Sequence, residues 1–435
     1  MQLRRFIVDV TPLRLDPAFR RLWIGITGSA GGKEAARLAI PLQAYLLTGS
    51  AASIAVVALA QLLATILFSL GGGALADAYD RRLVLFGSQA GMALVSGAML
   101  VTALIPGVPF PVIVLLAFLL AGLFAMENPA RIAAVPRVVP PERITSALAL
   151  TSLNYQVSSV VGPAAAGILI AIGGLPAAFA LQALAYAWAA YHAWRLPQLL
   201  TGGSSRPTLG TVADGLRFVR SSRLIKSAFG IDLVAMVFGL PLALIPVLAI
   251  DVLGVGAAGA ATLASVRGAG ALLAAFTSGW LPRVRLPGRA VIWSILLFSI
   301  ASTLLGLSGT SYPLALFAMA VCGATDVVSA VLRNAIVQTA TPDDFRGRVT
   351  AVHVLVAAGG PRVGDARAAL MAEVMGIGNS LAAGGLLAIA GLVLVARAVP
   401  EFRNYRILGR SERSPQAAVA TGGEGRVGNE PGERR

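Results

Sequence analysis

The chain has 435 residues, of which 57% are hydrophobic and only 13% are charged, and its mean hydropathy is +0.79. A water-soluble fold carries about 25% charged residues, so this composition excludes a soluble globular protein and indicates a chain solvated by lipid. The formal net charge of +15 comes from basic residues spread along the chain without aromatic interleaving. We therefore expect no nucleic-acid partner.

The first apolar segment contains the stretch GITGSAGGKEAARLAIP, residues 25 to 41. A phosphate-binding loop requires four residues between its first glycine and the Gly-Lys pair, followed by Ser or Thr. Here Gly28 and Gly32 enclose only three residues, and Glu34 follows Lys33. We therefore interpret this stretch as the middle of a membrane helix that carries three charges.

Apolar runs of about 20 residues, the length that crosses a hydrocarbon core, recur along the whole chain. The first run is too long and too charged for a cleavable signal peptide. The pattern predicts an all-α integral membrane protein with twelve transmembrane helices, at 22–47, 51–76, 83–105, 112–133, 145–170, 175–196, 224–249, 257–281, 290–308, 313–333, 349–372 and 376–398.

The longest internal gap between these runs separates six predicted helices from six more. A shift of 202 residues lays Leu22 on Leu224 and Arg131 on Arg333. Such a parallel repeat predicts two pseudo-symmetric six-helix halves around a central site. We expect a cytoplasmic N-terminal segment, a first half, a central cytoplasmic loop, a second half and a disordered cytoplasmic tail, at 1–21, 22–196, 197–223, 224–400 and 401–435.

Orientation follows from the loops that hold basic residues. The segments 48–51, 106–111 and 308–313, which alternate with the arginine-bearing loops, contain no Lys or Arg. This alternation predicts a multi-pass protein of the cytoplasmic membrane with both termini in the cytoplasm. A single cysteine, Cys322, lies inside a predicted helix, so we expect no intrachain disulfide, no metal and no cofactor. The chain lacks the HExxH and GxSxG patterns, and we expect no catalytic residues and no enzyme activity.

The loop GALADAYDRR, residues 73 to 82, resembles the signature of the major facilitator superfamily. The resemblance implies the fold of that superfamily. It also implies a conformational latch that does not touch substrate, made by Gly73, Asp77, Arg81 and Arg82.

Longer phrases are similar to the enterobactin (siderophore) exporter branch of drug:proton antiporter-like carriers in this superfamily. They are IPLQAYLLTGS at 40–50, NPARIAAVPRVVPPERI at 128–144 and VVSAVLRNAIVQTATPDDFRGRVTAV at 327–352. VVGPAAAG at 160–167 resembles the Gly-Pro element that antiporters carry in their fifth helix, here Gly162 and Pro163.

The resemblance implies a secondary active transporter, a proton-coupled exporter of a siderophore or similar small secreted metabolite that works by alternating access. Its partners are then the small-molecule substrate, the proton and the lipid bilayer, and we expect a monomer. The alternative is a multidrug or macrolide-type efflux carrier. A non-transporting membrane protein is the weaker hypothesis, because it has no reason to place ionisable groups inside the bilayer.

Ionisable residues inside the predicted helices are the candidate site, since a charge at the bilayer centre costs about 3 kcal/mol on insertion scales. One interpretation is internal ion pairing that specifies helix packing. The other is functional, with basic residues binding an anionic or catechol-like substrate and acids carrying protons. The substrate candidates are Lys33, Arg37, Arg267 and Arg362, and the proton candidates are Asp326, Asp232, Glu34 and Asp365.

The topology is tested by reporter fusions in the loops assigned to the outside. Fusions at Gly49, Gly107, Gly173 and Gly309 should all report an external location, because each site lies between two predicted helices in a segment without basic residues. A cytoplasmic signal from any one of them would show that the order of helices is wrong.

Overall fold

The structure of the chain, a computed structural model, describes residues 9–199 and 209–405. Within these ranges some side chains also lie outside the description: those of 70–78, 156, 159, 160, 163, 164, 209–213, 215, 280, 282, 283, 343, 344, 346, 347, 351, 354 and 355. The described part is helical, as expected for backbone that must satisfy its own hydrogen bonds in lipid. The tail expected to be disordered lies outside the described residues beyond Tyr405.

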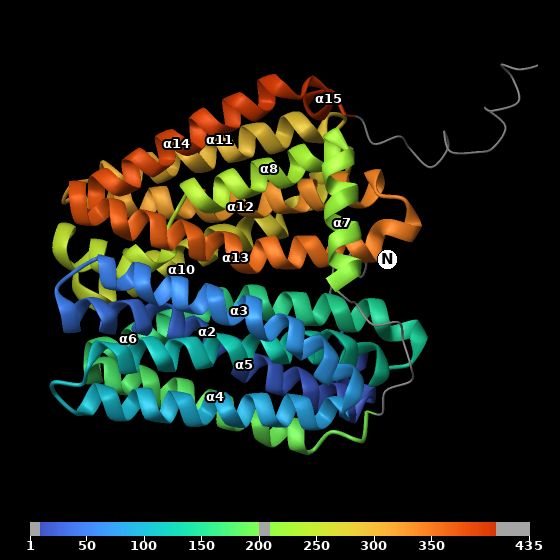
Figure 1. Cartoon of the computed structure of the whole chain (residues 1–435), viewed down its shortest axis with the longest axis horizontal. Coiled ribbons are helices and arrows are strands. Elements are labelled where there is room, and N and C mark those ends of the chain that lie inside the picture. The colour runs from blue at the N-terminus through green and yellow to red at the C-terminus, as the bar shows by residue number, and fades with distance from the viewer. Residues whose placement is uncertain (1–8, 200–208, 406–435) are drawn as a thin grey trace, which may run out of the picture.

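The long helices of the first half follow one another with short connections (Figure 1). They are α2 (Pro17–Thr48), α3 (Ala52–Ala78), α4 (Arg81–Leu104), α5 (Phe110–Ala134) and α6 (Ile144–Trp194), preceded by the short α1 (Thr11–Leu15). Those of the second half are α8 (Arg223–Phe238), α10 (Gly256–Phe276), α11 (Pro287–Gly306), α12 (Tyr312–Ala340), α13 (Asp343–Met375) and α14 (Ile377–Ala398), followed by α15 (Pro400–Arg403). The stretch 25–41 lies within α2, which confirms its interpretation as helix.

Helix α6 contains two of the expected membrane helices. Its backbone has φ 67° and ψ −167° at Gly174, a left-handed conformation that glycine adopts without steric cost. The chain therefore turns between the expected helices 145–170 and 175–196. Helix α8 is extended by a 3-10 turn, η4 (Leu242–Leu244), by α9 (Ile245–Val247) and by a π-helical stretch, η5 (Leu248–Val252).

Nine segments of the described chain are long and apolar enough to cross a membrane. They correspond to the expected helices two to four, six to ten and twelve. Expected helices one and eleven correspond to α2 and α13, which are 32 and 33 residues long and carry most of the interior charges. Expected helix five is the first part of α6.

The helices form two bundles that meet along two seams (Figure 1). Helices α2 to α6 pack on one another, and so do α8 and α10 to α14. Between the bundles, α3 packs on α13 and α6 packs on α10. The central segment carries one more helix, α7 (Leu209–Ser221), which crosses one end of the second bundle. Phe218 of α7 stacks on Phe345 of α13 with ring centroids 4.5 Å apart.

The two bundles close on each other at the end that holds residues 45–58. We call this contact the gate. Its apolar part joins α3 and the residue before it to η4, α9 and α13, through Ala51, Ile54, Ala55, Ala58, Ala243, Leu244, Val247, Ala366, Ala368, Ala369 and Ala372. Polar contacts border it: the Tyr45 hydroxyl donates to Asp251. The Glu373 carboxylate accepts from Ser50 Oγ at 3.0 Å and from the Ala52 amide at 3.1 Å.

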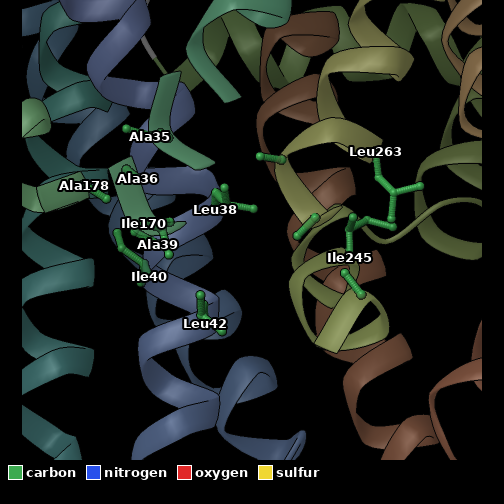
Figure 2. Packing of buried hydrophobic residues seen from close by; sticks show 14 of the residues in the cluster. Ala35, Ala36, Leu38, Ala39, Ile40, Leu42, Ile170, Ala178, Ile245 and Leu263 are labelled. Carbon is green, nitrogen blue, oxygen red and sulfur yellow. The ribbon is translucent and has the colours of Figure 1, made fainter. Parts of the chain in front are cut away.

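A larger apolar cluster contains residues of both halves (Figure 2). Leu38, Ile40 and Leu42 follow one another along α2, and Ile245 and Leu263 of the second half belong to the same cluster. All five side chains are buried. The two halves therefore share one hydrophobic core near the gate.

Candidate functional site

A cavity of about 1160 Å³ lies between the two bundles, deeper in the protein than the gate. Helices α2, α3, α5 and α6 line it from the first half, and α8, α10, α11, α12 and α13 from the second. Among the described residues, α4 and α14 contribute nothing to its wall. The cavity is therefore a feature of the interface between the halves.

The wall of the cavity is rich in charge, and the charges are unevenly divided. The first half contributes three basic residues, Lys33, Arg37 and Arg131. The second half contributes three basic and three acidic residues, Arg267, Arg333, Arg362, Asp232, Asp326 and Asp365. All four substrate candidates and three of the four proton candidates thus line one cavity. Glu34 does not line it, but lies 3.4 Å from Arg37 Nη1.

Arg267 and Asp326 form an ion pair in the cavity wall, with Nη2 and Oδ2 2.9 Å apart. The pair depends on close packing of α10 and α12, because a Cβ at Gly323 would lie 1.8 Å from the Arg267 carbonyl oxygen. The Asp326 side chain is 49% exposed, toward the cavity. A ligand in the cavity can therefore reach both partners.

Asp232 forms a second ion pair, but a buried one. Its Oδ1 lies 2.7 Å from Arg333 Nη2, and the Asp232 side chain is only 3% exposed. Arg333 also donates to Ser329 Oγ at 2.9 Å. This environment fits a packing role for Asp232, and proton transfer by this residue stays a prediction.

Lys33 is the cation of the wall with the fewest partners. Its ammonium lies 4.5 Å from the centroid of the Phe124 ring, and among the described residues it has neither a carboxylate partner nor a hydrogen bond. A cation–π contact leaves the ammonium free to bind an anion as well.

Arg362 and Asp365 lie one helical turn apart on α13 and have different partners. Arg362 Nη1 donates to the side-chain oxygen of Gln61 on α3. Asp365 accepts from the Ala243 amide of η4 at 3.2 Å. Arg362 therefore contacts the opposite half, whereas Asp365 holds two elements of its own half together.

One buried acid was missed by the sequence analysis. Glu127 of α5 is 1% exposed, and its Oε1 lies 3.6 Å from Nε of Arg131. The Arg131 guanidinium also lies 4.9 Å from the Tyr155 ring centroid. The sequence does contain a signal for this pair. An acid and an arginine four residues apart in an apolar helix lie on the same helix face.

The implied latch can be described only in part. Gly73 and Asp77 belong to α3, but the Asp77 side chain lies outside the described residues. Arg81 is buried and donates to the Ala133 carbonyl oxygen at 3.2 Å. The Arg82 guanidinium lies 5.0 Å from the Trp194 ring centroid. Both arginines thus contact their own half.

The Gly-Pro element lies where α6 crosses α2. Gly162 is buried, and a Cβ there would lie 2.7 Å from the Cβ of Glu34. The glycine therefore allows the two helices to approach at the level of the charged residues. The side chain of Pro163 lies outside the described residues.

A family model described as transmembrane secretion effector matches residues 8–427. The chain is 28% identical to the enterobactin exporter EntS of Escherichia coli O157:H7, over 97% of this chain and 100% of that protein. It is also 28% identical to the enterobactin exporter EntS of Shigella boydii serotype 18, over 93% of this chain and 97% of that protein.

Solved structures with similar folds are transporters. A bacterial homologue of the human lysosomal transporter Spinster has a TM-score of 0.71 at 16% identity, and the match covers 91% of this chain and 99% of that one. A POT family transporter has a TM-score of 0.70 at 13% identity, with 88% of this chain and 96% of that one covered. At these identities the likeness is one of fold.

The buried pair of Asp232 and Arg333 leads to a stability prediction. Asp232→Ala leaves the Arg333 charge buried without a partner, and should destabilise the folded protein by about 3–5 kcal/mol. Adding Arg333→Met removes that charge and should restore most of the loss. Thermal unfolding in detergent measures the stability of the single and the double variant. Asp326→Asn is the control, and it should change the stability little. A double variant as unstable as the single one would contradict the packing role.

Proposed function

This chain belongs to the transmembrane secretion effector family, and we propose that it is a proton-coupled secondary exporter of a siderophore or a similar small secreted metabolite. Its fold is that of the major facilitator superfamily, and it is a transporter of a small molecule rather than an enzyme. The observation that carries the proposal is the charged cavity between the halves, together with the enterobactin exporters among its relatives.

The cavity supports a large, oxygen-rich substrate. Its volume of about 1160 Å³ exceeds the roughly 300–1,000 Å³ of ordinary small-molecule pockets. Basic residues outnumber acidic ones in its wall by six to three. Arg37 and Arg131 have carboxylate partners behind the wall, whereas Lys33 has none among the described residues, so its ammonium can stabilise an anionic group. This balance favours an acidic metabolite over the cationic drugs of multidrug efflux.

The pair of Arg267 and Asp326 offers a donor and an acceptor side by side. Two neighbouring hydroxyls of a catechol match this arrangement, one accepting from the guanidinium and one donating to the carboxylate. The Asp326 side chain is 49% exposed toward the cavity, so a proton that enters the cavity can reach the same carboxylate. We therefore place the coupling proton on Asp326, beside the substrate group that Arg267 binds.

We propose that the protein lies in the cytoplasmic membrane. Both termini, with the tail, and the central segment 197–223 then lie in the cytoplasm. The gate then faces outward and is closed, and the cavity is loaded from the cytoplasm. Each chain contains a whole cavity, which supports transport by a monomer. Rocking of one half against the other opens the gate in turn.

The proposed substrate class is tested by comparing metabolites of a deletion strain with those of its parent. Under iron limitation the deletion strain should retain siderophore inside the cell and secrete less of it, and the wild-type gene should restore secretion. Unchanged secretion of siderophores combined with a new sensitivity to macrolides would favour the drug-efflux alternative.

The roles within the ion pair are tested in proteoliposomes with enterobactin as the probe. Arg267→Ala should weaken binding about tenfold or more, because a hydrogen bond to a charged group is lost. Asp326→Asn keeps an acceptor oxygen, so binding should change little, while stimulation of export by an imposed pH gradient should disappear. Full recovery of gradient-driven export in the Arg267→Ala, Asp326→Asn double variant would instead identify the pair as a packing element.

A further inference from the structure

Helices α3 and α13 lie side by side (Figure 1), and the seam between them holds residues of both the gate and the cavity wall. Ala51, just before α3, and Ala55 and Ala58 on α3 are followed one turn deeper by Gln61, which lines the cavity. On α13, Ala372, Ala369 and Ala366 are followed one turn deeper by Arg362, which also lines it. Spacings of three and four residues keep each series on one helix face.

Gln61 and Arg362 form a polar contact of this seam at the wall of the cavity. The Arg362 guanidinium donates to the side-chain oxygen of Gln61, across the boundary between the two halves. At the opposite end of the seam, Glu373 accepts from the Ala52 amide of α3 and from the hydroxyl of Ser50, which precedes that helix. Between these two polar contacts, the facing positions of α3 and α13 are mostly alanines, which bury little area per residue.

Resting on the proposed function, we propose that Gln61 is a positioning residue that couples occupancy of the cavity to the gate. In the empty carrier, Gln61 holds Arg362 and so keeps α3 against α13. An anionic or hydroxyl-bearing group of the substrate binds Arg362 in its place. The polar contact of the seam at the cavity is then lost, and the gate opens from the cavity outward.

The structure gives a physical reason for this order of events. A ligand can shift a conformational equilibrium only through contacts that differ between the two states. The hydrogen bond between Gln61 and Arg362 joins the two halves, so separating α3 from α13 breaks it, and both residues line the cavity. Substrate that binds Arg362 therefore acts directly on the closed state.

Two substitutions of nearly equal volume separate this role from simple packing. Gln61→Met removes the acceptor and should favour the open gate, whereas Gln61→Glu adds a charge opposite Arg362 and should favour the closed one. The reporter is a cysteine at the buried gate position 55, introduced as Ala55→Cys with Cys322→Ser, and its rate of reaction with a maleimide is followed on the full-length protein in detergent.

Without ligand, the Gln61→Met variant should react about three- to tenfold faster than the parent, the factor that corresponds to one net hydrogen bond. The Gln61→Glu variant should react more slowly. A packing effect would move both variants in the same direction, and that result, or no change in either, would overturn the proposal.

A second arm adds 2,3-dihydroxybenzoate as a catechol-bearing anionic probe. The probe should raise the maleimide reaction rate of the parent. It should raise the rate of the Gln61→Met variant much less, because that variant already lacks the hydrogen bond to Arg362. An equal response in both proteins would overturn the coupling role of Gln61. If the probe has no effect on the parent while the two variants still shift in opposite directions, the gate contact stands and the proposed substrate class is wrong.

Discussion

The cost of placing a charge in lipid determines how this protein is arranged. At about 3 kcal/mol per charge at the bilayer centre, helices with several interior charges cannot face the acyl chains. Helices α2 and α13 carry Lys33, Arg37, Arg362 and Asp365, and all four residues face the cavity between the halves. The charged helices thus keep the interface open and polar, while α4 and α14 remain outside the wall. Two bundles around a cavity satisfy this constraint, and a single fused bundle does not.

The two halves repeat in fold but differ in chemistry, and the difference creates the asymmetry of the cavity. Arg131 and Arg333 are equivalent under the shift of 202 residues, and both line the cavity. In the first half the carboxylate partner of Arg131 is Glu127, four residues earlier on the same helix. Glu127 does not line the cavity. The equivalent position in the second half is Ser329, and the acid is instead Asp232 on a neighbouring helix. The first half therefore contributes only positive charge to the cavity wall, whereas the second half contributes both positive and negative charge.

The sequence predicted the helices well, and the contacts between them poorly. Hydropathy identified the membrane segments, and arginine-rich loop phrases indicated the family. Helical periodicity shows which residues share a face of one helix, but not which helix lies opposite. The pairing of Arg267 with Asp326, 59 positions apart, depends on how closely α10 and α12 pack. Glu127 was overlooked because it lies in one of the most apolar runs of the chain, and Gln61 because the predicted site contained only ionisable residues.

The composition of the gate explains how a small ligand can control a large movement. Alanines let α3 and α13 approach closely. Each alanine buries little apolar area and so adds little stability to the contact, since burial contributes about 25 cal/mol per Å². The closed state then depends on a few polar contacts. Glu373 supplies one of them, since its carboxylate satisfies an amide at the start of α3 that has no partner within its own helix. Protein conformations that differ by a few kcal/mol are interchanged by ligands with comparable differences in affinity. A gate built from small side chains and bordered by hydrogen bonds lies in that range, whereas one sealed by large aromatic residues would hold the two halves closed against any substrate.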